Sequence, residues 1–178
     1  MQTSQLLSSV ALFTSAEAAL KLNITIIGAS NGASTLECWQ METPFSASTM
    51  PGTIGSASAL LGDAANITIT VLPAGYDGGL HNAPHNQWVA FISGLAYISL
   101  PTNDTSTAYV TGGEFGLIFA ADIADLSAQG HRTEYPGNTA TAVLVIPTKD
   151  GLVPSHSILH YGPCTTNDAD GIQGLADH

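Results

Sequence analysis

Short apolar runs, each followed by Gly, Pro, Asn or Asp, recur along the chain and constrain its fold more than any other feature. Runs of this length that are rich in Val, Ile, Thr, Phe and Tyr are typical of β-strands with a buried face. About ten such runs at this spacing predict an all-β sandwich or barrel. The expected strands cover residues 22–27, 35–41, 67–73, 87–93, 95–100, 108–111, 115–120, 132–135, 140–146 and 157–160.

The rest of the chain adds little regular structure to this prediction. Only residues 56–62 and 120–129 have a helix-like pattern, and both windows are short. The length of 178 residues favours one domain with a single core, expected over residues 19–164. Residues 165–178 are polar and contain glycine, so we expect a flexible C-terminal tail.

The chain is strongly acidic, and its charge limits the partners that it can bind. Three Lys and Arg residues oppose 14 Asp and Glu residues, which gives a formal net charge of −11. Phosphate backbones and anionic membranes repel such a chain, so we expect no nucleic-acid or membrane partner. After the N-terminus, no stretch contains the 18 consecutive apolar residues typical of a membrane-spanning helix.

Residues 1–18 have the pattern of a secretory signal peptide. The apolar stretch 6–13 precedes Ala16-Glu17-Ala18, which fits a small-x-small cleavage site. The alternative is that this segment forms a helix of the core. N-glycosylation sequons also favour a secretory route, and the expected location is the secretory lumen or the cell exterior. The three sequons begin at Asn23, Asn66 and Asn103.

Cys38 and Cys164 are the only cysteines, and they lie near opposite ends of the expected domain. In an oxidising compartment, two cysteines with no third candidate most simply form a disulfide. The alternative is two buried free thiols.

Residues 75–94, with the sequence GYDGGLHNAPHNQWVAFISG, are the most informative stretch. They resemble the first motif of the cupins, in which a Gly is followed after five residues by His-x-His, then by a Glu and a Gly. Gly75, His81 and Gly94 match that pattern, whereas Ala83 and Gln87 replace the second His and the Glu. The resemblance implies a cupin-like jelly-roll β-barrel, a fold whose sheets often pair as homodimers.

Strand geometry gives these positions a separate interpretation. Residues two apart share one face of a strand, so His81, His85 and Gln87 are expected to line one cavity with Val89 and Phe91. Trp88 should then face the opposite side. On an ideal strand, His81 and His85 would lie about 13 Å apart, too far for one metal ion unless Pro84 breaks the strand.

The region of the second cupin motif supplies other candidates. It lacks the expected Pro-x-Gly, and His131 is its only imidazole. Asp77, Asp122 or Asp125 could form an acid–base pair with His81 or His131. Arg132, the only arginine, could bind an acidic or enolic oxygen of a substrate, although an ion pair with Glu134 or Asp125 is the favoured interpretation.

The whole chain is similar to a group of small secreted fungal proteins. Cys38-Trp39-Gln40, His81-Asn82-Ala83-Pro84 and Gly162-Pro163-Cys164 carry this match. The group resembles cofactor-free hetero-Diels–Alderases of fungal tropolone–sesquiterpenoid pathways. That resemblance implies natural-product biosynthesis, in which an apolar substrate loses water and then undergoes a cycloaddition.

The first hypothesis is therefore a secreted enzyme that binds an apolar small molecule in a barrel cavity and needs no cofactor or metal. Its catalytic candidates are His81, His85, Gln87 and His131. A metal-dependent dioxygenase or isomerase is the second hypothesis, and a secreted protein that only binds a ligand is the third. The expected substrate-binding residues are Arg132, Trp39, Val89, Phe91 and Phe119.

Overall fold

Two large β-sheets and one two-stranded sheet form the protein, whose structure is a computed structural model that describes residues 20–101 and 103–168. The expected signal peptide lies outside the described residues, as does most of the expected C-terminal tail. The larger sheet contains, in spatial order, β13 (His156–Tyr161), β2 (Ala33–Pro44), β1 (Lys21–Ser30), β10 (Leu117–Ala120), β7 (Gln87–Ser93), β12 (Thr141–Pro147) and β5 (Thr68–Leu72). The smaller sheet contains β6 (Tyr76–His81), β11 (His131–Tyr135), β8 (Leu95–Leu100) and β9 (Asn103–Thr111).

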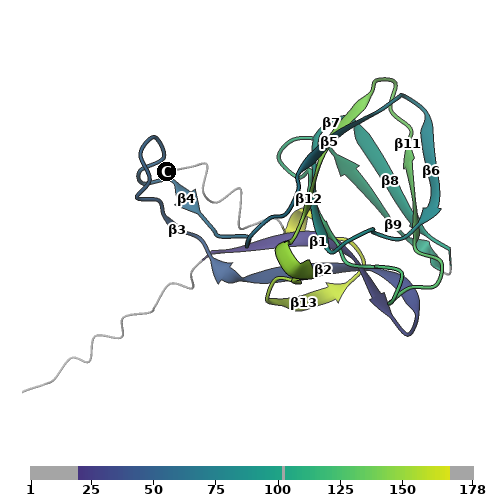
Figure 1. Ribbon diagram of the computed structural model, residues 1–178, viewed down its shortest axis with the longest axis horizontal. Helices are drawn as coiled ribbons and strands as arrows, with labels where there is room; N and C mark the ends of the chain where they lie inside the picture. The colour runs from purple at the N-terminus through teal and green to yellow at the C-terminus, as the bar shows by residue number, and fades with distance from the viewer. Residues whose placement is uncertain (1–19, 102, 169–178) are drawn as a thin grey trace, which may run out of the picture.

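The two sheets face each other across the upper part of the molecule, while β1, β2 and β13 extend below them (Figure 1). Neighbouring strands in both sheets run antiparallel, except for β1 and β10, which pair in parallel. A short hairpin of β3 (Ser46–Ala47) and β4 (Ala57–Ser58) projects to one side. The fold is all-β, as the strand pattern predicted, and it is jelly-roll-like, as the resemblance to the cupin motif implied.

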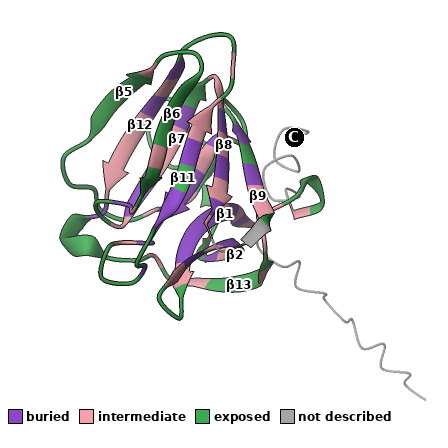
Figure 2. Cartoon of the chain, turned by 90° about the vertical axis from the view of Figure 1, so that its right-hand side faces the viewer, coloured by how far each residue is buried: buried purple, intermediate pink, exposed green. Residues whose placement is uncertain are grey.

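The larger sheet separates two apolar clusters, because alternate residues of its strands point to opposite faces. The cluster between the sheets includes Phe91, Ile98 and Val143. The cluster on the other face of the larger sheet includes Trp39, Trp88 and Phe119. Figure 2 shows the resulting alternation of buried and exposed positions along the strands.

All ten predicted strands are present, and those over 87–93 and 95–100 have the predicted boundaries. Strand β6 was missed because Gly78 and Gly79, which are poor strand formers, interrupt its sequence. Neither helix-like window forms a helix. Residues 57–58 belong to β4, and in the second window Asn82 Nδ2 donates to the carbonyl oxygens of Asp122 and Ser127.

The described helices are two three-residue turns, η1 (Lys149–Gly151) and η2 (Thr166–Asp168). No helix in residues 20–101 and 103–168 is long and apolar enough to cross a membrane. Turn η2 lies at the start of the expected tail. There the Asp168 carboxylate accepts hydrogen bonds from the backbone N–H and the hydroxyl of Thr165 and forms an ion pair with His160.

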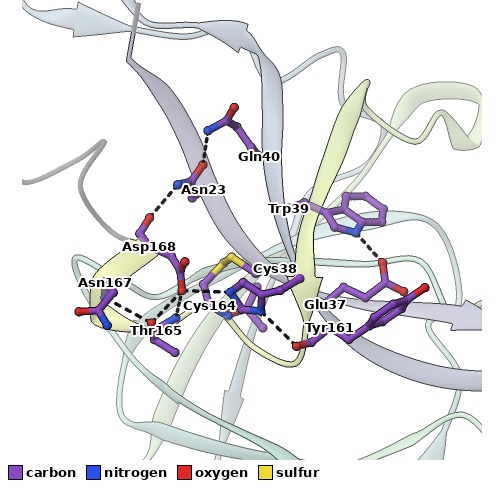
Figure 3. The surroundings of a disulfide bond; sticks show 12 residues. Asn23, Glu37, Cys38, Trp39, Gln40, Tyr161, Cys164, Thr165, Asn167 and Asp168 are labelled. Atoms are coloured by element: carbon purple, nitrogen blue, oxygen red, sulfur yellow. Dashed lines mark hydrogen bonds and ion pairs between the residues drawn. A yellow bond between two sulfur atoms is a disulfide. The ribbon is translucent and has the colours of Figure 1, made fainter. Parts of the chain in front are cut away.

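Cys38 and Cys164 form the predicted disulfide (Figure 3). Cys38 lies fully buried on β2, and its Cα atom is 4.7 Å from that of Cys164. Hydrogen bonds also hold the C-terminal segment, since the Cys164 N–H donates to Thr25 Oγ1 at 2.9 Å. A buried disulfide is compatible with a secreted protein.

The three sequons differ in their surroundings. Asn66 is exposed in the segment before β5. Asn23 lies on β1, where its Nδ2 donates to the Asp168 carbonyl oxygen at 2.8 Å. Asn103 is the first residue of β9, and its side chain lies outside the described part of the chain. Of the two sequon asparagines whose side chains are described, Asn66 therefore has the more accessible amide.

Candidate active site

A cavity of about 160 Å³ lies between the two sheets. Strands β5, β7 and β12 supply one wall, and β6, β8 and β11 supply the other. Most of the lining is apolar, and it includes Val89 and Phe91 as predicted. Its imidazole and amide side chains are His81, His131 and Gln87. The cavity thus combines apolar walls with a few polar groups, the usual composition of a small-molecule site.

His131 is held by a buried carboxylate at the wall of this cavity. Its Nδ1 lies 2.7 Å from Oδ2 of Asp122, whose side chain is fully buried. A carboxylate only accepts hydrogen bonds, so Nδ1 carries the proton and donates to Asp122. Within the described residues, Nε2 of His131 makes no hydrogen bond, and this nitrogen is therefore left with its lone pair for a ligand.

A network of hydrogen bonds fixes Asp122 in place. Ser34 Oγ donates to Oδ2 at 2.7 Å and also contacts Ser127 Oγ at 2.8 Å. The Ala83 N–H donates to Oδ1 at 3.3 Å. A carboxylate without such partners would be costly to bury, and these neighbours satisfy both oxygens. Asp122 is thus built into the fold as the group that orients His131.

His81 is the cross-strand neighbour of His131, and their ring centroids are 4.5 Å apart. Its Nδ1 donates to the Gly79 carbonyl oxygen at 2.9 Å, which leaves Nε2 as an acceptor. Gly130 allows this close pairing, because a Cβ atom there would clash with the His81 carbonyl group. The two imidazoles at the cavity therefore come from strands β6 and β11, which pair in the fold although they lie far apart in the sequence.

Gln87 is buried, and its Oε1 has no hydrogen-bond partner in the described structure. A buried polar atom without a partner costs about 1–3 kcal/mol, so such atoms are uncommon away from functional sites. Because Gln87 also lines the cavity, its Oε1 is available to a hydrogen-bond donor of a ligand.

His85 does not share this cavity, contrary to the prediction from alternation. Strand β6 ends at His81 and β7 begins at Gln87, so residues 82–86 form a connection in which His85 is exposed. Ala83 makes a bridge to Ile123 within that connection, and Pro84 follows it. The strand pattern therefore stops between His81 and Gln87, and His85 is the one position of the predicted cavity face that does not line the cavity, whereas His81, Ala83 and Gln87 do.

Arg132 also lies outside the cavity, on the opposite face of β11 from His131 and Thr133. Its guanidinium pairs with Asp77, with Nε donating to Oδ1 at 3.0 Å, and lies 3.7 Å from Glu134. The hydrogen bond from Arg132, together with the Gly79 N–H, lowers the pKa of the Asp77 carboxyl group to about 2. The ion-pair interpretation is confirmed, with Asp77 as the main partner in place of Asp125.

Trp39 and Phe119 were predicted to bind substrate, but they face away from the cavity. Both belong to the cluster on the other face of the larger sheet, where their ring centroids are 6.2 Å apart. Trp88 lies in the same cluster, so the predicted division of β7 into a cavity face and an opposite face is confirmed. These two residues were predicted from their aromatic side chains alone, which do not show which face of the sheet a ring occupies.

The donor atoms at the cavity do not form a metal site. In the described residues, the one cluster of three histidine, cysteine or acidic ligand atoms is Cys38, His160 and Asp168. Cys38 is in the disulfide and has no thiolate to offer. At the cavity, Ala83 and Gln87 replace two ligands of the cupin pattern, and Asp122 is already bound to His131. The residues present therefore do not fit a bound transition metal.

Comparisons with known proteins identify no family for this chain. No family model matches the chain, and no curated protein does. Among solved structures, the Bacillus halodurans protein BH2720 is similar, with 18% identity, a TM-score of 0.36, and coverage of 55% of this chain and 70% of that one. A likeness at this level carries no argument about fold or activity.

Proposed function

We propose that this protein is an enzyme that binds a small apolar molecule in the cavity and transfers a proton at His131. The observation that carries the proposal is the buried Asp122–His131 pair at the wall of an otherwise apolar cavity. Buried carboxylate–imidazole pairs of this kind hold an imidazole in one tautomer and stabilise the imidazolium that forms when it takes a proton.

Each polar group at the cavity has a separate part in the proposed reaction. His131 Nε2 acts as general base, because its Nδ1 proton is held by Asp122. His81, when it is in its imidazolium form, acts as the proton donor beside it. Gln87 Oε1 accepts a hydrogen bond from a donor group of the substrate and so orients it.

The size of the cavity restricts the substrate class. An engineered apolar cavity of about 150 Å³ accepts benzene, whereas pockets for drug-sized ligands are about 300–1,000 Å³. The cavity of about 160 Å³ therefore suits one aromatic ring with small substituents, or the reacting end of a longer molecule. We propose a hydroxymethyl-substituted enol or phenol, which fits the dehydration and cycloaddition that the fungal resemblance implies.

A simple compound, 2-hydroxybenzyl alcohol, tests this reaction. His131 takes the phenolic proton, and the benzylic hydroxyl leaves as water after receiving a proton from His81. The resulting quinone methide adds ethyl vinyl ether across its oxygen–carbon diene and gives 2-ethoxychroman, which chromatography with mass detection measures. We expect the folded chain to raise the rate of product formation above that of buffer.

Variants of His131 and His85 compare a histidine that lines the cavity with one that is exposed on the surface. His131→Asn should lower turnover by about 10²–10⁴-fold, the usual contribution of general acid–base catalysis. His85→Ala should leave turnover unchanged, because His85 is exposed and outside the cavity. Thermal unfolding of both variants controls for loss of the fold. Binding of the alcohol without any turnover would favour a ligand-binding protein and contradict the enzyme proposal.

The metal content of the protein gives an independent prediction. Because His81 and His131 have no third ligand at the cavity, we expect well under one equivalent of any transition metal in purified protein. Incubation with EDTA should leave turnover unchanged. Elemental analysis that finds a stoichiometric metal, lost in His81→Ala, would instead support the metal-dependent hypothesis.

A further inference from the structure

A second pocket lies on the larger sheet, away from the cavity between the sheets, and the buried residue Glu37 is part of its lining. It has a volume of about 310 Å³ and lies against β2 and β13. Glu37 is only 5% exposed, yet its side chain lines the pocket. The surrounding side chains are apolar or aromatic and unusually exposed, namely Leu126, Val153, Ile158 and Tyr161.

Neutral donors hold the Glu37 carboxylate in place. Thr35 Oγ1 donates to Oε1 at 2.7 Å, and Trp39 Nε1 donates to Oε2 at 2.7 Å. Trp39 is itself fixed by His156, whose ring stacks on the indole with centroids 3.3 Å apart. The position of the carboxylate is therefore set before any ligand arrives.

The charge of Glu37, by contrast, has no counter-charge. Among residues 20–101 and 103–168, no Lys, Arg or His nitrogen lies within 4.0 Å of this carboxylate. The chain has only three Lys and Arg residues. Lys21 pairs with Glu42, Arg132 pairs with Asp77, and Lys149 lies in η1. A buried carboxylate is normally paired, so this one is suited to a cation from outside the chain.

Two features leave the carboxylate open to such a cation. Gly28 lies beside it, and a Cβ atom at that position would come within 3.3 Å of Oε1. Tyr161, the cross-strand neighbour of Glu37, is 74% exposed and supplies a free aromatic ring. In Figure 3 the carboxylate lies between the Trp39 indole and the Tyr161 ring.

We infer that this pocket binds a small methylated ammonium compound. A primary ammonium group needs three hydrogen-bond acceptors. Both Glu37 oxygens already accept a hydrogen bond, from Thr35 and from Trp39, and the other side-chain acceptors of the lining are the hydroxyls of Ser30 and Tyr161. A quaternary ammonium needs none, because its methyl groups match apolar walls and its charge is attracted by a carboxylate and by an aromatic face. The net charge of −11 favours its approach.

Choline and its neutral isostere, 3,3-dimethyl-1-butanol, test this inference on the folded chain. The readout is the indole N–H signal of Trp39 in nitrogen–proton NMR, since the chain has only two tryptophans and Trp88→Phe identifies the other. Choline should shift the Trp39 signal in a saturable way. The isostere should bind roughly tenfold or more weakly, because it lacks the charge that Glu37 attracts.

Matched variants locate the site. Glu37→Gln should weaken choline binding by roughly tenfold or more. Glu42→Gln removes the same charge from an exposed position of β2 and should leave binding unchanged. Tyr161→Ala should weaken binding by about twofold to thirtyfold, the usual range of a cation–π contact.

Gly28→Ala keeps the charge but places a methyl group 3.3 Å from Glu37 Oε1, 3.1 Å from Thr35 Oγ1 and 2.8 Å from Ile26 Cδ1, so it should also weaken binding, and thermal unfolding checks that the variant is folded. This variant and Tyr161→Ala keep the test decisive if Glu37→Gln does not fold. Equal binding of the isostere, or unchanged affinity in Tyr161→Ala and Gly28→Ala, would overturn the inference. Neither result would affect the proposed role of His131, which lines a different cavity.

Discussion

Replacing Cys38 and Cys164 by Ala together should lower the free energy of unfolding by about 5 kcal/mol. The disulfide joins residues 126 positions apart, and closing so long a loop removes much of the entropy of the unfolded chain. Chemical denaturation of protein made with and without the two cysteines measures the difference. The effect is large against a typical domain stability of about 5–15 kcal/mol.

The environment of the disulfide explains why its loss should also loosen the C-terminal segment. The disulfide joins that segment to Cys38 on β2, and two hydrogen bonds join it to β1, one from the Cys164 N–H to Thr25 Oγ1 and one from Asn23 Nδ2 to the Asp168 carbonyl oxygen. Figure 3 shows the disulfide and the contact of Asn23 with Asp168. Reduced native-sequence protein should match the double variant, and dithiothreitol should leave the double variant unchanged. Two free thiols in protein secreted through an oxidising compartment would show that the disulfide does not form, and would therefore contradict the prediction.

Trp88→Ala should destabilise the fold by about 3–5 kcal/mol, the usual cost of removing a buried aromatic side chain. Trp88 is 5% exposed and meets Phe119 edge to face, with ring centroids 5.0 Å apart. The cluster that contains both rings covers the outer face of the larger sheet, so the loss leaves a cavity there. Thermal or chemical unfolding of the variant measures this cost.

Ile92→Ala is the matched control for Trp88→Ala on the same strand. Ile92 is 51% exposed, and its replacement should change the stability by about 0.5 kcal/mol or less. Similar destabilisation by both substitutions would mean that the packing of Trp88 in the cluster with Trp39 and Phe119 does not contribute to the stability of the fold. Turnover of Trp88→Ala, measured where the protein is folded, should fall much less than that of His131→Asn.

Local sequence determined the strands and the alternation of their faces. Strands β7 and β8 have the predicted boundaries because β-branched and aromatic runs between turn residues are favourable only as strands. The division of Trp88 from Val89 and Phe91 follows from the two-residue period of a strand. The disulfide was also predictable, because only one pair of cysteines exists.

Tertiary structure decided which of these faces became the site. Trp39 and Phe119 belong to strands that are buried on both faces, and alternation does not say which face meets the cavity. Ser34, Asp122 and His131 converge because the order of strands in the sheets brings distant segments together. Glu37 had no local signal, since only the folded chain shows that no Lys, Arg or His nitrogen of residues 20–101 and 103–168 lies within 4.0 Å of its carboxylate. Sequence patterns act over a few residues, whereas these contacts join residues that only the packing of two sheets makes neighbours.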